Sequence, residues 1–367
     1  MPARAETLRA NPLNLTRLGP AEGRCMAPHP VPFRVEEEDE MRLPIVASCV
    51  ALAAGTAAAE TPVLTVLTYD SFTSEWGPGP AVEKAFEETC ACDLRFVAAG
   101  DGAALLARLQ LEGARSEADV VLGLDTNLTA AAAATGLFAP HGVSTPLDLP
   151  VAWEDPLFLP FDWGWFAFVH DRRMEDVPAS FEELAASDSK IVIQDPRSST
   201  PGLGLLMWVK AAYGDRAPEI WEGLADNIVT VTPGWSEAYG LFMEGEADMV
   251  LSYTTSPAYH LIAEEDDTKT AAAFREGHYL QVEVAGKLAA TDQPELADRF
   301  MAFLLEEPVQ SVLPTTNWMY PAKLPAAGLP EGFETLVQPE TSLLLSADEA
   351  LALRPEALAE WQDALAR

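Results

Sequence analysis

The sequence ValLeuThrValLeuThrTyr at 63–69 opens the stretch that decides the fold. Its β-branched and aliphatic residues predict a strand, and this pattern returns twice after segments with helical periodicity. The helical segments are AlaValGluLysAlaPheGluGlu (81–88) and AlaAlaLeuLeuAlaArgLeuGlnLeuGlu (103–112), and the later strands are LeuArgPheValAla (94–98) and AlaAspValValLeuGly (118–123). Strands that alternate with helices in this way predict a mainly parallel sheet with helices on both faces.

A second alternating series predicts a second unit of the same kind. It comprises strands at 190–194, 228–232 and 248–253 and helices at 203–212 and 235–243. Two long extended segments bracket this series, an aromatic one at 158–170 and another at 277–285. Extended segments on both sides of a middle unit predict a double crossover between two lobes.

We therefore predict an α/β chain of two lobes, each a mainly parallel sheet flanked by helices, joined by two crossover hinge strands. Further helices are expected near 295–305 and 346–366. In the last helix, Ser346 and Glu349 form a capping box, and Leu358, Trp361 and Leu365 share an apolar face. The predicted limits are 61–165 with 280–325 for lobe 1, 166–279 for lobe 2, and 326–367 for a C-terminal helical segment.

The composition is that of a globular protein long enough for two domains. The chain has 367 residues, of which 49% are hydrophobic and 22% charged. Its 57 acidic and 23 basic residues give a net charge of −34. This charge argues against nucleic acid as a partner. It mildly favours cationic ligands, although an ordinary solvated surface explains it equally well.

The first sixty residues have the pattern of a leader rather than of a folded domain. Residues 41–59 combine a basic start, an apolar run and a small-residue end, which is typical of a signal peptide cleaved after Ala59. We interpret Met41 as the true start and residues 1–40 as a non-native or disordered extension. Lipidation at Cys49 is the weaker alternative, because too few residues separate it from Met41.

The cysteines and histidines suggest no metal site. Removal of the leader leaves only Cys90 and Cys92, and export favours a disulfide between them, with free buried thiols as the alternative. The five histidines are dispersed, and neither a His-x-x-His nor a Cys-x-x-Cys spacing occurs. We also find no hydrolase elbow, metalloprotease motif or P-loop. The sequence therefore predicts no catalytic residues, no metal and no cofactor.

Three strand-to-helix junctions share one design. They lie at Asp101-Gly102, at Ser199-Thr200 and along the run Tyr253, Thr254, Thr255 and Ser256, where Ser256-Pro257 is expected to cap a helix. Free N–H groups and a positive helix end bind phosphate without Lys or Arg. Ligands of open α/β sheets lie at these carboxyl ends of strands. Each junction alone is more often only a capped helix.

Aromatic residues at similar positions form the second component. Tyr69 ends the first strand, Trp235 opens a helix, and Tyr259 lies in the first turn after Ser256. Three such rings could enclose a flat cationic ring, with each contact contributing roughly 0.5–2 kcal/mol. The alternative is that these residues belong to the core or to the interface between the lobes.

Taken together, these segments resemble the periplasmic thiamine-binding proteins of bacterial ABC importers, within family 1 of the extracellular solute-binding proteins. The resemblance covers essentially everything after the leader. The matching motifs are ThrTyrAspSerPhe (68–72), TrpGlyProGlyPro (76–80), AlaAspValValLeuGlyLeuAsp (118–125), GlnAspProArgSerSerThrProGlyLeuGlyLeu (194–205), GlyTrpSerGluAlaTyrGlyLeuPhe (234–242), SerTyrThrThrSerProAlaTyrHis (252–260), GluGlyHisTyrLeuGlnValGluVal (276–284) and AsnTrpMetTyrPro (317–321).

The resemblance implies a type II periplasmic-binding fold with the ligand between the lobes. Tyr69, Trp235 and Tyr259 would stack on the rings of thiamine. Asp101-Gly102, Ser199-Thr200 and Tyr253 to Ser256 would hold its hydroxyethyl or phosphate end, so the mono- and diphosphate are ligands too. The implied partners are an inner-membrane ABC permease and its cytoplasmic ATPase, and the implied compartment is the periplasm. We expect a monomer.

Two other functions compete with this interpretation. The first is a thiaminase-like enzyme on the same fold, which would need a nucleophilic cysteine at Cys90 or Cys92. The second is a binding protein for another solute, such as a polyamine, a phosphonate or ferric ion. Tyr253, Tyr259 and His260 are the residues that leave ferric ion open.

Overall fold

The structure, a computed structural model, describes residues 61–366. The predicted extension 1–40, the signal peptide 41–59 and Cys49 lie outside the described residues. No helix within residues 61–366 combines the length and apolarity that crossing a membrane requires.

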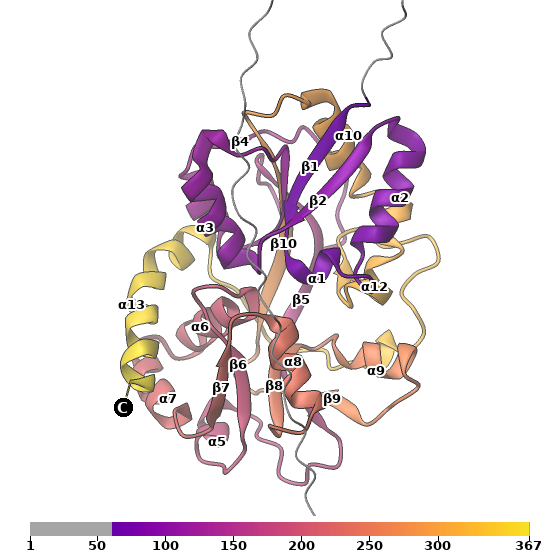
Figure 1. The fold of residues 1–367 in the computed structure, drawn as a ribbon. Helices are drawn as coiled ribbons and strands as arrows, with labels where there is room; N and C mark the ends of the chain where they lie inside the picture. The colour runs from indigo at the N-terminus through magenta and orange to yellow at the C-terminus, as the bar shows by residue number, and fades with distance from the viewer. Residues whose placement is uncertain (1–60, 367) are drawn as a thin grey trace, which may run out of the picture. The chain divides into compact units, whose positions relative to one another are not determined.

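The first predicted strand–helix series forms one half of a large sheet (Figure 1). Strands β2, β1 and β3 lie side by side in parallel. Each connecting segment contains a helix that brings the chain back to the end of the sheet at which the preceding strand began. The elements are β1 (Val63–Thr68), α1 (Asp70–Thr73), α2 (Gly79–Cys90), β2 (Asp93–Ala98), α3 (Gly102–Glu112) and β3 (Val120–Asp125).

The second series forms the other half in the same way. Strands β8, β6 and β7 are parallel, with β6 in the middle. The elements are β6 (Ile191–Gln194), α6 (Thr200–Tyr213), β7 (Ile228–Thr232), α8 (Trp235–Met243), β8 (Met249–Tyr253) and α9 (Pro257–Ala263). We refer to the half with β1–β3 as lobe 1 and to the half with β6–β8 as lobe 2.

Two long antiparallel strands join the halves, as the extended segments predict. β10 (His278–Leu288) pairs with β3 of lobe 1 and, over Leu280–Gly286, with the first part of β5 (Phe158–Asp171). From Phe166 to His170, β5 pairs instead with β8 of lobe 2. The partner changes between Trp165 and Phe166, at the predicted edge of lobe 1. The exact limits of the two lobes stay a prediction.

The remaining elements are short, apart from the helices α7, α10 and α13. They are η1 (Gly113–Arg115), α4 (Thr129–Ala133), β4 (Phe138–Ala139), α5 (Phe181–Ala185), η2 (Gly214–Arg216), α7 (Ala217–Leu224), β9 (Lys269–Ala271), α10 (Pro294–Phe303), α11 (Glu307–Gln310), α12 (Leu313–Thr316), β11 (Tyr320–Pro321), η3 (Phe333–Thr335), β12 (Ser342–Leu343) and α13 (Ala347–Leu365).

Aromatic clusters fill the core of each lobe. In lobe 2 the fully buried Trp208 of α6 packs edge-on against Phe181 and beside Phe274, with ring centroids 4.8 and 5.4 Å away. In lobe 1, Phe86 of α2 meets Phe300 of α10 at 5.2 Å. Helix α6 is apolar on nearly every side, because it is covered by the sheet on one side and by α13 on the other.

The C-terminal helix α13 contacts both lobes. It packs on α6 and α7 of lobe 2 and also on α4, which follows β3 of lobe 1 (Figure 1, yellow). The predicted capping box of Ser346 and Glu349 is present. Trp361 is buried, and Leu358 and Leu365 pack against the core, as predicted. The helix therefore packs on elements of both lobes, and the limits predicted for the C-terminal segment, 326–367, stay a prediction.

Replacement of the cap should loosen α13. Ser346→Ala removes the acceptor for the Glu349 N–H, and we expect the free energy of unfolding to fall by about 1 kcal/mol. Urea denaturation would measure this change. Ser346→Thr keeps a hydroxyl cap and serves as the control; equal losses in both variants would contradict a capping role.

Candidate functional site

Two of the predicted junctions meet directly across the two lobes. Asp101 precedes α3, and its Oδ2 accepts a hydrogen bond of 2.8 Å from Ser199 Oγ, which precedes α6. The Gly102 N–H donates to Asp101 Oδ1 at 3.0 Å and to Thr200 Oγ1 at 3.2 Å. A second link joins the Ala104 N–H to the Ser198 carbonyl. The amino ends of α3 and α6 are thus brought together, as their place at the carboxyl ends of strands predicts.

The third junction differs from its prediction in one respect. Helix α9 begins at Pro257 as expected, but Ser256 does not cap it with its side chain. Ser256 has helical backbone angles (φ −57°, ψ −32°), so its hydroxyl does not reach the first N–H groups of the helix. It instead contacts Ser252 Oγ at 2.6 Å and accepts from the Tyr253 N–H at 3.2 Å. The predicted cap is wrong, and the hydroxyl stabilises the turn instead.

Of the other residues of this junction, Thr254 and Thr255 are buried and Tyr253 is partly buried. Thr254 donates its N–H to the Trp165 carbonyl of the crossover strand, and its hydroxyl has no partner within the described chain. The hydroxyl of Thr255 contacts Met319 Sδ at 3.8 Å. The Tyr253 ring packs beside Phe166 at 5.0 Å. The junction is therefore attached to β5 and to the segment after α12.

Two of the three predicted aromatic residues lie beside tryptophans of lobe 1. Trp235 donates from Nε1 to Ser252 Oγ at 2.8 Å, and its ring lies 6.3 Å from that of Trp76. Tyr259 lies 5.4 Å from the ring of Trp318. Trp76 is 52% exposed, which is unusual for so large an apolar side chain. Both tryptophans belong to motifs that carry the family resemblance, 76–80 and 317–321, but neither was predicted to be a site residue.

Tyr69 has a different environment from the other two. Its side chain is 5% exposed, its ring meets Phe72 edge-on, and it lies where a side chain at Gly123 would be. Gly123 has φ +103°, a conformation that glycine adopts readily. The Tyr69 hydroxyl donates to Glu283 Oε2 at 2.9 Å. Tyr69 therefore presents its hydroxyl, rather than a free ring face, to the centre of the sheet.

A pair of buried carboxyl groups on the crossover strands was not predicted from the sequence. Asp162 of β5 and Glu283 of β10 are register partners, and they are 0% and 6% exposed. Asn317 donates to Asp162 Oδ2 at 2.6 Å, and Gln281 donates to Glu283 Oε1 at 2.8 Å. No Lys or Arg of residues 61–366 forms an ion pair with either group. The centre of the molecule is therefore acidic without a compensating base.

Burial makes these groups hard to ionise. It raises the pKa of Asp162 to about 7, while hydrogen bonds with Asn317 and Glu283 oppose the rise. Burial, followed by the charge of Asp162, raises the pKa of Glu283 well above its ordinary value. Burial likewise raises the pKa of Asp125, at the end of β3, to about 7. Burial also raises the pKa of Asp101, which its hydrogen bonds lower in part.

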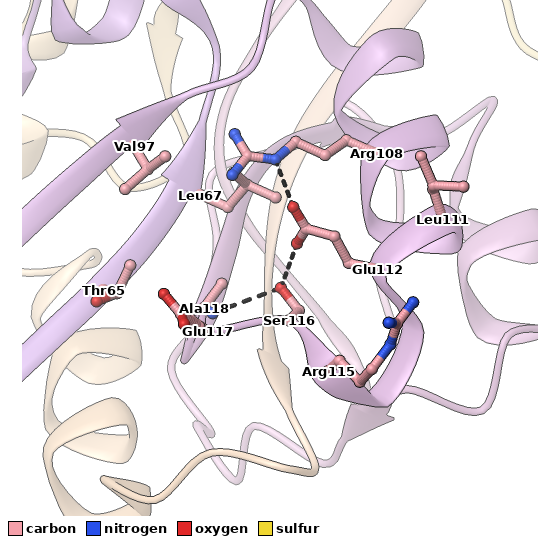
Figure 2. Close-up of a pocket in the computed structure, with 10 residues that line it drawn as sticks. All are labelled: Thr65, Leu67, Val97, Arg108, Leu111, Glu112, Arg115, Ser116, Glu117 and Ala118. Atoms are coloured by element: carbon pink, nitrogen blue, oxygen red, sulfur yellow. Dashed lines mark hydrogen bonds and ion pairs between the residues drawn. The ribbon is translucent and has the colours of Figure 1, made fainter.

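A separate cavity lies away from this centre. It has a volume of about 450 Å³ and lies between α3 and strands β1 and β2. Figure 2 shows Arg108, Glu112 and Ser116 along its wall, joined by hydrogen bonds of 2.7 and 2.8 Å through Glu112. None of the predicted site residues lines it. It does not contribute to the junction between the lobes.

The three residues proposed for ferric ion do not converge. His260 is buried, and its nitrogens contact Tyr239 and Glu264. The Tyr259 hydroxyl donates to Glu264, while Tyr253 lies against Phe166. Within the described chain, His260, Glu264 and Asp266 have ligand atoms close enough for one ion. This group contains no tyrosine.

The two cysteines form a disulfide at the end of α2. Both Cys90 and Cys92 are buried, and the bond joins residues two positions apart. Of the two states expected from the sequence, the structure has the oxidised one. A thiolate nucleophile requires a free thiol, which neither residue has in this state.

Comparison with known sequences places the chain in a family. The profile of the bacterial extracellular solute-binding proteins matches residues 78–311.

The chain belongs to this family.

Several relatives of this solute-binding protein are similar over almost their whole length. A thiamine-binding periplasmic protein of Salmonella typhimurium is 54% identical over 310 residues, which are 83% of this chain and 94% of that protein. A thiamine-binding periplasmic protein of Haemophilus influenzae is 43% identical over 286 residues, 77% of this chain and 86% of that protein.

Solved structures show the same fold. A periplasmic thiamin binding protein superimposes with a TM-score of 0.82 at 53% identity, covering 84% of this chain and 98% of that one. A ferric binding protein from Campylobacter jejuni reaches 0.67 at 16% identity, covering 82% and 99%, which shows the fold alone. The solute-binding protein thus has the predicted two-lobed periplasmic-binding architecture.

Removal of one buried carboxyl group should change how stability depends on pH. An Asp with an ordinary pKa of about 3.9 in the unfolded chain and about 7 in the folded chain favours folding below the lower value. This contribution is lost as pH rises through the higher value. As the pH rises from the lower to the higher value, Asp162→Asn should therefore gain stability relative to the original protein by about 1.4 kcal/mol per pH unit.

Urea denaturation at a series of pH values would test this expectation. Asp292→Asn removes a negative charge at an exposed position and is the matched control for the loss of one carboxyl group. Parallel stability curves for Asp162→Asn and the original protein would show that Asp162 is ionised throughout.

Proposed function

We propose that this protein binds thiamine and its phosphates between its two lobes in the periplasm and delivers them to an ABC importer. The observation that carries the proposal is the combination, at the lobe junction, of aromatic rings that are exposed or half-buried with buried carboxyl groups that have no Lys or Arg partner within residues 61–366. Thiamine is a flat molecule with a cationic ring, and this combination suits such a ligand. The names of the relatives at 54% and 43% identity support the same ligand.

The rings of the ligand would lie among the aromatic side chains of both lobes. Trp235 and Tyr259 come from lobe 2, while Trp76 and Trp318 approach them from the other side. A cation over such a ring gains roughly 0.5–2 kcal/mol, and more where water is excluded. Tyr69 would contribute its hydroxyl rather than its ring face. Binding would therefore require both lobes at once.

The hydroxyethyl or phosphate end would lie at the helix ends. Asp101, Gly102, Ser199 and Thr200 bring the amino ends of α3 and α6 together, and backbone N–H groups at such ends bind anions. The Asp101 carboxylate would oppose a phosphate, whereas a ligand hydroxyl could donate to it. Tyr253, Thr254, Thr255 and Ser256 would complete the third side.

Delivery would follow from closure of the lobes around the ligand. In this structure Asp101 and Ser199 bond across the junction, so the two lobes touch there. A ligand that contacts both lobes stabilises the closed state over the open one. The permease would then recognise the closed surface, and its ATPase would drive release.

The competing functions have less support. The disulfide between Cys90 and Cys92 leaves no free thiol within residues 61–366 for a thiaminase-like reaction, so we propose no enzymatic activity. A ferric site would need ligands that converge, and Tyr253 does not join His260. A polyamine remains the alternative that the acidic centre also suits, because it too is a cation.

Calorimetric titration tests the proposal. The protein would be unfolded and refolded to remove carried-over ligand, then titrated separately with thiamine, its mono- and diphosphate, and putrescine. We expect sub-micromolar binding of the thiamine compounds and recovery of intact ligand by mass spectrometry. Cleaved thiamine would indicate the enzyme, and heat with putrescine alone would indicate a polyamine-binding protein.

Trp235→Ala should weaken thiamine binding at least tenfold with the fold intact. The substitution removes a ring that stacks on the ligand and the donor to Ser252. Calorimetry would measure the affinity and circular dichroism the fold. Trp235→Phe keeps an aromatic face and should lose much less; unchanged affinity in the alanine variant would exclude Trp235 from the site.

Asp101→Asn should shift the preference toward thiamine diphosphate. Oδ1 accepts from Gly102 and Oδ2 from Ser199, so the amide keeps one acceptor oxygen, replaces the other with a donor, and removes a negative charge beside the phosphate position. The ratio of diphosphate to thiamine affinity should rise several-fold, measured by parallel titrations. Asp215→Asn, at an exposed position in lobe 2, controls for net charge. An unchanged ratio would mean that Asp101 does not face the phosphate.

A further inference from the structure

The buried acidic pair lies where several elements of the fold converge. Asp162 and Glu283 occupy paired positions on β5 and β10, and Glu283 accepts from the Tyr69 hydroxyl. The titratable groups that face the pair from the surrounding elements are Tyr69 after β1, Asp101 before α3, Asp125 of β3 and Tyr253 of β8. All of them are acidic or neutral. The positive charge of Arg354 on α13 acts on Asp125, whose pKa it lowers.

Unpartnered acceptors beside the pair point to a missing donor. Asp162 Oδ1 and Gln281 Oε1 are buried and have no hydrogen-bond donor within the described residues. Gln281 is fixed beside Glu283, because its amide nitrogen donates to Glu283 Oε1. A buried acceptor without a donor destabilises the folded protein, because it has lost its hydrogen bonds with water. Two such acceptors next to two carboxyl groups suit a ligand that carries N–H groups or positive charge.

In the absence of a ligand, a proton can serve as the counter-charge. Two carboxyl groups can hydrogen-bond to each other only when one of them is protonated. Burial and mutual repulsion both favour the protonated form, and the pKa of Asp162 is raised to about 7 by burial. The pair would thus retain one proton near neutral pH and accept a cation only by losing it.

We propose that Asp162 and Glu283 are the counter-charge of the cationic ligand, and that binding of the ligand displaces the proton which this pair holds in the empty protein. The inference rests on the proposed function, since thiamine supplies the cation. In the exchange a carboxylic O–H bond breaks, the proton passes to solvent, and the carboxylate that remains faces the ligand. No bond of the ligand changes.

The exchange makes affinity depend on pH in a defined direction. While the pair holds its proton, binding must release that proton, and affinity should rise by up to tenfold per pH unit. Once the pH is high enough for the pair to lose the proton before the ligand binds, affinity should level off. A site that used only aromatic rings and neutral donors would have the same affinity throughout this range.

Calorimetry of the whole protein with thiamine tests the proposal. Titrations at pH 6, 7 and 8, each in two buffers of different ionisation enthalpy, give the number of protons released per ligand bound. We expect about one proton at pH 6 and an affinity at least fivefold higher at pH 7 than at pH 6, and the release should fall wherever the affinity levels off. This measurement requires no variant, so it stands if a variant fails to fold.

Variants of the pair add a second readout. Glu283→Gln and Asp162→Asn should each weaken thiamine binding at pH 8 and abolish most of the proton release at pH 6. Glu331→Gln and Asp292→Asn alter exposed carboxyl groups and should change neither quantity.

The outcomes separate the two proposals. Thiamine binding without proton release, at a constant affinity from pH 6 to pH 8, would overturn the role of the pair and leave the proposed function intact. Proton release that persists in both variants would also overturn it. Failure of thiamine to bind at any pH would overturn the proposed function and this inference with it.

Discussion

The pairing of β5 with β10 is the constraint on which the rest of the structure depends. The two strands are hydrogen-bonded from Leu280 to Gly286, and β5 then continues into lobe 2 to pair with β8. One register therefore sets the position of β3 relative to β8, and with it the distance between the junctions that follow those strands. A shift of β5 by one residue against β10 would turn Asp162 to the opposite face of the sheet, away from Glu283.

The same register explains why the candidate site lies at the lobe junction. Each site segment follows the carboxyl end of a strand in one lobe, and the crossover strands bring these ends together. Asp101 and Ser199 meet across the lobes, while Tyr69 reaches Glu283 at the centre. The helix ends supply neutral donors, and the crossover strands supply negative charge. Two chemically different parts of one ligand could thus be bound by two different parts of the fold.

Sequence periodicity predicted the architecture because the strands and helices here agree with their local patterns. The ranges predicted for α8 and β7, 235–243 and 228–232, coincide with the observed ones. The acidic pair could not be found in this way. In the segment 158–170 one Asp among aromatic residues could equally face solvent, and only the pairing with β10 places it beside Glu283. Ser256 was assigned a cap from its residue type, whereas its backbone angles decided otherwise.

The continuity of β5 and the position of α13 also bear on how such proteins diversify. Lobe 2 is inserted into lobe 1 through two strands, and α13 lies against α4 as well as α6 and α7. A recombination that exchanged one lobe for that of a distant relative would have to match the β5 pairing on both sides and the α13 surface as well. Exchange of whole lobes is therefore structurally demanding, and single substitutions at the loop ends offer the easier evolutionary route to a new solute.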